Sequence, residues 1–197
     1  MLRLWLIRHG QTPGNKLQRY IGVTDEPLSP EGIAYLQTLS YPKPEMVFVS
    51  PMRRCVQTAG ILFPDQKLQI IDKLSECDFG EFENKNYLEL GDNPAYQAWV
   101  DSGGRLPFPG GESREEFKHR SILGFQTAVR TCLRKRSQTA ALVIHGGTIM
   151  NLMEEYCEEK RAFYEWAVSN GNGYLVEIEE SLWEQGKRSM RLLEKFN

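Results

Sequence analysis

The sequence predicts an α/β fold, a three-layer α/β/α sandwich with a mostly parallel central sheet and a small helical lid. Segments of strand length alternate with helical segments along the 197 residues, an order typical of parallel sheets. Three strand segments, 2–7, 46–49 and 140–144, are almost continuously apolar, as in strands that helices cover on both faces. A chain of this length builds one sizeable core, so we expect a single domain over residues 1–197.

The first part of the chain alternates strands and capped helices. Strands are expected at 2–7, 46–49 and 68–71, and a loop at 11–28. Ser29-Pro30 begins a helix to about Leu39, because serine caps helices and proline suits the first helical position. Ser50-Pro51 repeats this signal before a helix to about Leu62.

The second part contains the candidate lid. Residues 84–112 combine prolines and glycines with few regular signals and form a lid insertion. Ser113 to Glu116 fits a capping box and starts a helix to about Arg136. A buried strand at 140–144 and a helix at 147–157 follow. From Trp166 on, the pattern indicates a strand, a glycine-rich turn at 170–173, a second strand and a tail.

Composition excludes several classes of protein. The net charge is −2, which lacks the basic excess of a general nucleic-acid binder. No apolar run approaches the roughly 20 residues that span a bilayer, and the first residues lack the cleavage site of a signal peptide. We therefore expect a cytoplasmic protein without nucleic-acid or membrane partners. Four scattered cysteines and three histidines argue against a disulfide framework or a metal site.

Polar side chains follow three of the expected strands directly. Arg8 and His9 follow the first strand, Ser50 and Arg54 the second, and His145 the strand at 140–144. Ligands of parallel sheets bind beyond the carboxyl ends of the strands, so these groups should share one edge. Guanidinium groups match phosphate oxygens, and helix N-termini favour anions. The pattern predicts a phosphate pocket with a histidine nucleophile, although each residue alone could be an ordinary loop, turn or surface residue.

Four segments, in this order, resemble the motifs of the histidine phosphatase superfamily, also called the phosphoglycerate mutase-like family. They are Arg8-His9-Gly10-Gln11-Thr12 with Asn15, Ser50 to Ala59, Leu74 to Gly80, and Val143 to Gly147. Together they cover about residues 1–155. The resemblance implies a phosphoglycerate mutase-like fold and an enzyme that passes a phosphoryl group through a histidine.

The resemblance also implies a role for each matching residue. His9 would be the nucleophile, and Arg8, Arg54 and His145 would bind the phosphate oxygens. Glu76 would protonate the leaving oxygen and then activate water; without the resemblance, nothing distinguishes it from its acidic neighbours Asp78, Glu81 and Glu83. Asn15, Thr12, Gly22 and Gly146 are the expected substrate-binding positions. The cationic groups can stabilise the transition state without a metal, so neither metal nor cofactor is expected.

Three features favour a phosphatase over a mutase. The chain is shorter than typical mutases of this family, its acidic motif is Glu-Cys-Asp-Phe-Gly instead of Glu-Arg-His-Tyr-Gly, and residues 84–112 hold only two cations, Lys85 and Arg105. We expect a metal-independent phosphomonoesterase that acts on a small phosphate ester through a phosphohistidine. A broad-specificity phosphatase, a phosphoglycerate mutase and a non-catalytic binding module are the alternatives.

A further likeness concerns the substrate. Leu4 to Gly10 and Tyr20-x-Gly22-x-x-Asp25-x-Pro27-Leu28 resemble α-ribazole phosphatases of cobalamin biosynthesis, and Pro109 to Ser113 with Arg120 recurs in small phosphatases of the family. Aromatic residues of the lid could stack on a flat base or simply pack the lid; they are Tyr87, Tyr96, Trp99 and Phe108. The sequence indicates no oligomeric state, and the segment after about residue 155 carries no functional signal.

Overall fold

A six-stranded sheet forms the centre of the computed structural model, which describes residues 1–196. The strands are β1 (Leu2–Arg8), β2 (Met46–Val49), β3 (Leu68–Ile70), β4 (Thr139–Ile144), β5 (Gly173–Ile178) and β6 (Arg191–Phe196). Their order across the sheet is β3-β2-β4-β1-β5-β6. The first four run parallel, and β5 pairs antiparallel with both β1 and β6. The predicted mostly parallel sheet is confirmed.

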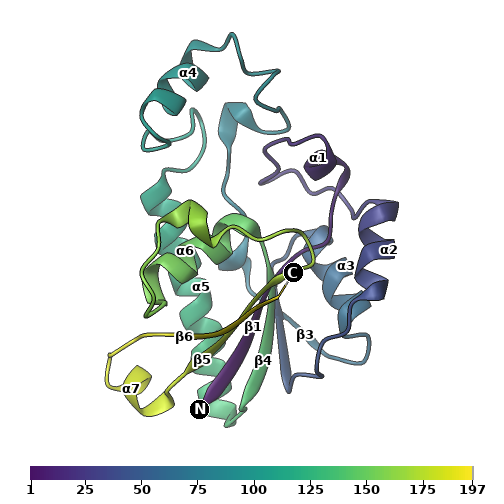
Figure 1. Cartoon of the computed structure of the whole chain (residues 1–197), viewed down its shortest axis with the longest axis vertical. Helices are drawn as coiled ribbons and strands as arrows, with labels where there is room; N and C mark the ends of the chain where they lie inside the picture. Colours follow the sequence, from purple (N-terminus) through teal and green to yellow (C-terminus); the bar gives the residue numbers. More distant parts are fainter. Residues whose placement is uncertain (197) are drawn as a thin grey trace.

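Helices cover both faces of the sheet and complete three layers (Figure 1). One face packs on α3 (Arg53–Leu62), and α2 (Pro30–Thr38) lies against α3. Ile7, Val49 and Val143 of the strands are buried on this face. The other face packs on α5 (Arg114–Lys135) and α6 (Gly146–Tyr156) in a larger apolar core. Burial on both sides explains the continuous apolar runs of the central strands.

The helix-start signals at 29–30 and 113–116 act as predicted. The Ser29 hydroxyl accepts from the Gly32 N–H at 3.0 Å and caps α2. Ser113 and Glu116 form the capping box of α5, each satisfying the other's backbone N–H.

Residues 84–112, the expected lid, stand beyond the carboxyl edge of the sheet, at the top of Figure 1. They contain one helix, α4 (Pro94–Asp101), capped by Asn93. Tyr96 and Leu90 of this segment are buried together with Phe82, which precedes it, and Trp99 packs against them. This aromatic cluster is separate from the two cores that cover the sheet.

Three local predictions were wrong. The expected loop at 11–28 contains a short helix, α1 (Pro13–Lys16), capped by Thr12. Ser50 does not cap α3, which starts after Met52 without a side-chain cap, because the Ser50 hydroxyl is bonded to a histidine instead.

The third error concerns the segment around Trp166, which was expected to be a strand. Phe163–Trp166 is a 3-10 helix, because the fully buried Trp166 packs into the core beside α6 instead of at a sheet edge. The chain then turns into β5, passes through α7 (Glu180–Glu184) and ends in β6.

No helix within residues 1–196 is long and apolar enough to cross a membrane.

Candidate active site

His9 lies directly beyond β1, where its backbone N–H donates to the Ile144 carbonyl of β4 at 2.9 Å. Its ring is nearly fully buried. Nδ1 is 2.7 Å from the carbonyl oxygen of Gly10, so Nδ1 carries the proton and Nε2 is left with a free lone pair. Burial, reinforced by the charges of Arg54 and Arg8, holds the pKa of His9 well below its usual value of 6.5. The ring is therefore neutral at pH 7.

His145, at the end of β4, meets His9 edge to face, with ring centroids 5.2 Å apart. Its Nε2 is 2.7 Å from the Ser50 hydroxyl, and Arg54 Nε donates to its Nδ1 at 3.3 Å. Both ring nitrogens thus have partners within the protein. Burial, together with Arg54, holds the pKa of His145 well below 6.5.

Arg54 is the buried member of the Arg53-Arg54 pair and is fully enclosed, whereas Arg53 is exposed. Its two terminal nitrogens donate to backbone carbonyls of the loop ahead of α2, to Thr24 and to Gly22, each at 2.8 Å. Of the two neighbouring arginines, Arg54 is therefore the one that lies beside His145.

Arg8 donates from one terminal nitrogen to the Val168 carbonyl at 2.7 Å, and its buried Nε has no partner among the described residues. Neither Arg8 nor Arg54 forms an ion pair within residues 1–196. The Glu76 carboxylate acts on Arg8 through its charge, but from beyond ion-pair distance. Largely buried cations without a carboxylate in direct contact are costly in a protein interior, and a phosphate group is an anion that suits such a pair of guanidinium groups.

Glu76 lies across from these cations, against the N-terminus of α6. One carboxylate oxygen accepts from the N–H of Cys77 at 2.9 Å and the other from the N–H of Gly147 at 3.1 Å. Burial raises the pKa of Glu76 above its ordinary value, against the opposing effect of these two hydrogen bonds and of Arg54 and Arg8. A carboxyl group in such a place can hold a proton nearer to neutral pH than an exposed one.

The structure separates Glu76 from its acidic neighbours, which the sequence alone could not do. Asp78 accepts from the Gly80 N–H in a turn, and Glu81 is exposed. Glu83 accepts from the backbone N–H groups of Gly22 and Thr24, at 2.8 and 2.9 Å. Of the four, Glu76 is the one that borders the cationic pocket.

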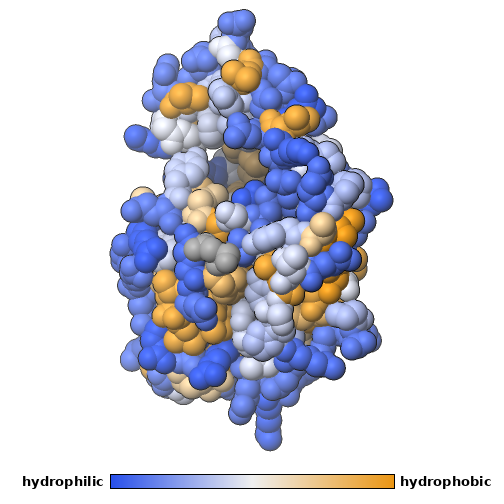
Figure 2. Space-filling model, turned by 45° about the vertical axis from the view of Figure 1, so that its right-hand side comes forward, coloured by the Kyte–Doolittle hydropathy of each residue, from blue (hydrophilic) through white to orange (hydrophobic). Residues whose placement is uncertain are grey.

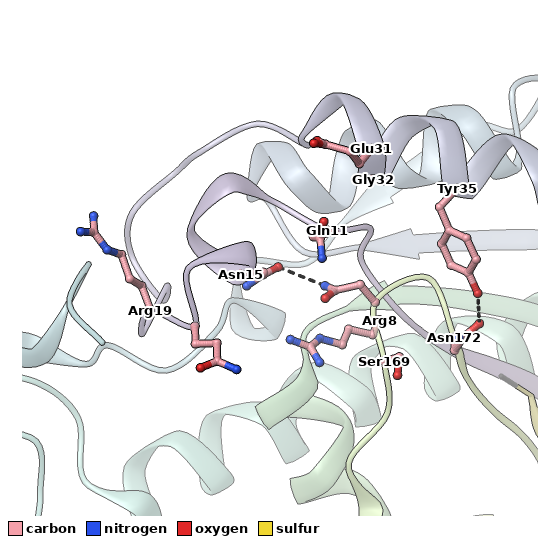
Figure 3. Close-up of a pocket in the computed structure, with 11 residues that line it drawn as sticks. Arg8, Gln11, Asn15, Arg19, Glu31, Gly32, Tyr35, Ser169 and Asn172 are labelled. Carbon is pink, nitrogen blue, oxygen red and sulfur yellow. Dashed lines mark hydrogen bonds between the residues drawn. The ribbon is translucent and has the colours of Figure 1, made fainter. Parts of the chain in front are cut away.

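The remaining expected site residues take different places. Asn15 and Arg8 both line the groove of Figure 3, where the side chain of Asn15 accepts from Asn170. Thr12 is fully buried, and its hydroxyl accepts from the Asn15 N–H and caps α1, so it holds the backbone of Asn15 and does not face the groove. Gly22 holds Arg54 through its carbonyl, and a β-carbon there would overlap the carbonyl oxygen of Cys77. Gly146 begins α6 beside Arg8, and a β-carbon on Gly146 would lie only 3.3 Å from Arg8 Nε, a tight contact.

Sequence reasoning missed the contribution of the segment after residue 155. Asn170, in the turn at 170–173, donates to the His9 carbonyl and to the Asn15 side chain, each at 3.0 Å. The Val168 carbonyl holds Arg8 as described. The order Asn-Gly-Asn-Gly indicates a turn and nothing more; only the pairing of β5 with β1 brings this turn to the site.

Two cavities adjoin the cationic pocket. A polar groove of about 850 Å³ lies on the side of Arg8 and Asn15, and Figure 3 shows both side chains facing it together with Gln11 and Ser169. An apolar cavity of about 210 Å³ lies on the side of Glu76. Figure 2 shows the surface hollowed between the lid and the rest of the molecule.

The apolar cavity is lined mainly by aromatic side chains, and its rim includes Glu76, Gly147 and Arg114. Of the four lid aromatics singled out from the sequence, Trp99 and Phe108 line this cavity, Tyr96 is buried inside the lid and Tyr87 is exposed. Arg114 is already paired with Glu154 at 2.8 Å. Tyr96 thus packs the interior of the lid, whereas Trp99 and Phe108 are in reach of a molecule bound in the cavity.

Within residues 1–196, no group of three or more histidine, cysteine or acidic side chains is placed to hold a metal ion. The positive charge of the pocket comes from Arg8, Arg54 and the N-terminus of α6. The described part of the chain thus carries its own charge for binding an anion.

Comparisons with known proteins identify the family and the fold. The family model described as histidine phosphatase superfamily (branch 1) matches residues 4–189. Phosphoserine phosphatase 1 of Hydrogenobacter thermophilus is 27% identical over 91% of this chain and 88% of its own length. Adenosylcobalamin/α-ribazole phosphatase of Escherichia coli is 33% identical over 60% of this chain and 63% of its own length. The crystal structure of the α-ribazole phosphatase from Shigella flexneri, 24% identical, superposes with a TM-score of 0.82 over 98% of this chain and 96% of that one, which shows a shared fold.

Proposed function

Because this chain belongs to the histidine phosphatase superfamily, we propose that it is a metal-independent phosphomonoesterase that forms a phosphohistidine on His9. One observation carries the proposal: a neutral, buried histidine with a free Nε2 lies beside two guanidinium groups, those of the fully buried Arg54 and the partly buried Arg8, and neither forms an ion pair within residues 1–196. Such a pocket suits a phosphoryl group, for which positioning and charge stabilisation are most of what an enzyme supplies.

In the first step, His9 Nε2 attacks phosphorus, and the bond between phosphorus and the ester oxygen breaks. Arg8 and Arg54 stabilise the charge on the non-bridging oxygens, and Asn15 is placed beside Arg8 as a further donor. Glu76 gives its proton to the departing oxygen, which its raised pKa favours. The Nδ1–H of His9 keeps its bond to the Gly10 carbonyl and stabilises the charged ring.

In the second step, the Glu76 carboxylate takes a proton from water, and the resulting hydroxide attacks phosphorus while the bond to Nε2 breaks. His9 returns to its neutral form and inorganic phosphate leaves. His145 orients Arg54 through Nδ1 in the present arrangement. Its expected contact with a phosphate oxygen would need Nε2 to leave Ser50.

The cavity beside Glu76 supports a flat, apolar leaving group. A leaving alcohol protonated by Glu76 would extend into this cavity, which Trp99 and Phe108 line. The α-ribazole phosphatase relative of Escherichia coli then suggests α-ribazole 5′-phosphate, and with it a place in cobalamin biosynthesis. The polar groove beside Arg8 offers hydrogen-bonding groups to hydroxyl-bearing parts of a substrate.

Phosphoserine is the second candidate substrate, because the phosphoserine phosphatase relative matches over 91% of this chain. A phosphoserine substrate would place a charged amino acid in the apolar cavity, where Arg114 is the one cation among the described lining residues and is engaged by Glu154. Desolvating such a group without a partner is unfavourable, so the aromatic substrate fits better.

The experiment is phosphate release across a substrate panel, with a chelator present and His9→Ala as control. The panel holds α-ribazole 5′-phosphate, phosphoserine, 3-phosphoglycerate and 4-nitrophenyl phosphate. We expect the highest kcat/KM for α-ribazole 5′-phosphate and no turnover by a folded His9→Ala protein. Preference for phosphoserine would replace the substrate, and transfer between positions of 3-phosphoglycerate without phosphate release would indicate a mutase. Turnover by His9→Ala would contradict the mechanism, and inactivity on every substrate would favour a binding module.

A further inference from the structure

Arg120 of α5 makes an unusually complete set of hydrogen bonds to the segment that carries Glu76. One terminal nitrogen donates to the carbonyls of Lys73 and Ser75, at 3.2 and 2.9 Å, and the other donates to the carbonyl of Glu76 at 3.1 Å. Nε and the same second nitrogen donate to the two carboxylate oxygens of Glu112, at 2.9 and 2.7 Å. These bonds use all five N–H donors of a guanidinium group.

Glu112 fixes the other side of the same segment. Its carboxylate accepts from the Asp78 N–H, and its own N–H donates to the Asp78 carbonyl, both at 2.9 Å. Nearby, the Glu81 N–H donates to the Pro109 carbonyl at 2.8 Å. The last residues of the lid therefore lie against the segment that follows Glu76.

The carboxylate of Glu76 has no side-chain partner among the described residues. Its oxygens accept only from the backbone of Cys77 and Gly147. A β-carbon on Gly147 would lie 2.6 Å from one of these oxygens and 2.9 Å from the ring of Phe117, so the carboxylate occupies a narrow space. Its position depends on where the backbone of residues 75–78 is held, and Arg120 and Glu112 hold that backbone from both sides.

We propose that Arg120 and Glu112 are positioning residues for the general acid Glu76, and that through Glu112 they tie its position to the lid. The proposal rests on the proposed function, because it assumes that Glu76 protonates the leaving oxygen. Neither residue hydrogen-bonds to the side chains of the cationic pocket, and the charge of Arg120 is the smallest of the effects on His145. Their main effect should therefore appear in the proton transfer.

The discriminating measurement is kcat/KM for two substrates that differ in their need for an acid. An alkyl phosphate needs a proton on its leaving oxygen, whereas 4-nitrophenyl phosphate does not. The ratio kcat/KM reports on the first step alone, so the second step, in which Glu76 acts as a base, does not enter. We expect Arg120→Gln to lower kcat/KM for the alkyl ester about 30- to 100-fold, the effect of a misplacement of about 1 Å, and for the aryl ester less than about 3-fold.

The pH dependence of kcat/KM is a second test, because it should not shift if Arg120 only stabilises the fold. Burial raises the pKa of Glu76, so a carboxyl group released into water should titrate closer to its ordinary value of 4.5. The basic limb of the profile for the alkyl ester should then move to lower pH in Arg120→Gln. Arg120→Lys retains the charge but not the planar fork, so it should recover only part of the loss.

Lys118→Gln is the matched control. Lys118 lies on the same helix and also pairs with carboxylates, those of Glu154 and Glu155 of α6, but it makes no hydrogen bond or ion pair with the segment that carries Glu76. It should leave both kcat/KM values unchanged. Glu112→Gln is the second variant, in case Arg120→Gln does not fold: it keeps the bonds from Arg120 to the backbone and should show the same selective loss at a smaller size.

Equal losses for the two esters, or no loss for the alkyl ester, in the folded variant would overturn the proposal. Failure of the proposed function would look different. The protein with Arg120 intact would then release no phosphate from any substrate, or His9→Ala would remain active.

Discussion

Gly22 determines how closely the loop that holds Arg54 can approach the segment of Glu76. A β-carbon on residue 22 would overlap the carbonyl oxygen of Cys77 and would lie 2.9 Å from the ring of Phe79, whereas ordinary contacts are 3.4–4 Å. In Gly22→Ala the two backbone segments must separate by about 1 Å or more. The carbonyl of Gly22, which accepts from Arg54 at 2.8 Å, moves with its segment.

The expected size of the effect follows from these contacts. Overpacking of this kind costs about 1–3 kcal/mol, and a hydrogen bond to a charged donor contributes about 1.5–3 kcal/mol. Because Arg54 keeps its bond to the Thr24 carbonyl, part of the loss is recovered. We expect the free energy of unfolding to fall by about 2 kcal/mol, which lowers Tm by about 4–8 °C in a chain of this size. The displaced guanidinium should lower kcat/KM about 100-fold.

Thermal unfolding and kcat/KM on an aryl phosphate measure the two effects. The aryl ester is the right substrate because it needs no acid, so the loss reports on Arg54 and not on Glu76. Gly60→Ala is the control: Gly60 is an exposed position of α3 where a β-carbon meets nothing within 4 Å. Alanine there should stabilise the helix by about 0.5–1 kcal/mol without changing kcat/KM. Wild-type kcat/KM in Gly22→Ala would refute the idea that Gly22 places Arg54.

Three further outcomes are expected. Glu76→Gln should lower kcat/KM for alkyl phosphates at least about 10-fold more than for aryl phosphates, since only the former need a proton; equal losses would contradict its role as acid. Burial, with Arg54 beside both rings, holds the pKa values of His9 and His145 well below 6.5. Below pH 6.5 the unfolded chain therefore takes up protons that the folded chain does not. The free energy of unfolding then decreases as the pH is lowered, by up to about 1.4 kcal/mol per pH unit for each ring. Tm measured between pH 7 and pH 5 should therefore fall more steeply in the wild type than in His145→Gln, and equal slopes would count against buried neutral rings. Removal of metal ions with EDTA should leave phosphate release unchanged, because Arg8 and Arg54 supply the positive charge; inactivation restored by a divalent ion would show otherwise.

Most of the order of strands and helices was predictable, because the local signals agree with the tertiary fold except at α1 and at the segment around Trp166. Continuous apolar runs marked the strands of the parallel sheet, and Ser29 and Ser113 capped the helices that they precede. The signal at Ser50 failed although its residues are the same as at Ser29-Pro30. The hydroxyl of Ser50 is hydrogen-bonded to His145 Nε2 at 2.7 Å instead. This partner is 95 residues away in the sequence, so the local sequence does not reveal it.

The convergence of Arg8, His9, Arg54 and His145 was also predictable, because parallel strands place their carboxyl ends on one edge. The choice of Glu76 among four acidic residues was not derivable from the local pattern, since all four lie within an exposed-looking loop. Contact with Gly147 at the start of α6 distinguishes it, and that contact exists only once α5 and α6 have packed on the sheet.

The sequence by itself determined the fold class, the main strands and helices from β2 to α6 and which charged residues reach the edge of the sheet, because these depend on periodicity, capping and strand direction. Only the tertiary structure decided the protonated nitrogen of His9, the raised pKa of Glu76, the division of the lid aromatics between packing and cavity, and the bonds that Asn170 makes to His9 and Arg120 makes to the backbone of Glu76. Each of these depends on burial or on a partner far along the chain. Desolvation and long-range contacts arise when the layers close, and no local stretch of sequence encodes them.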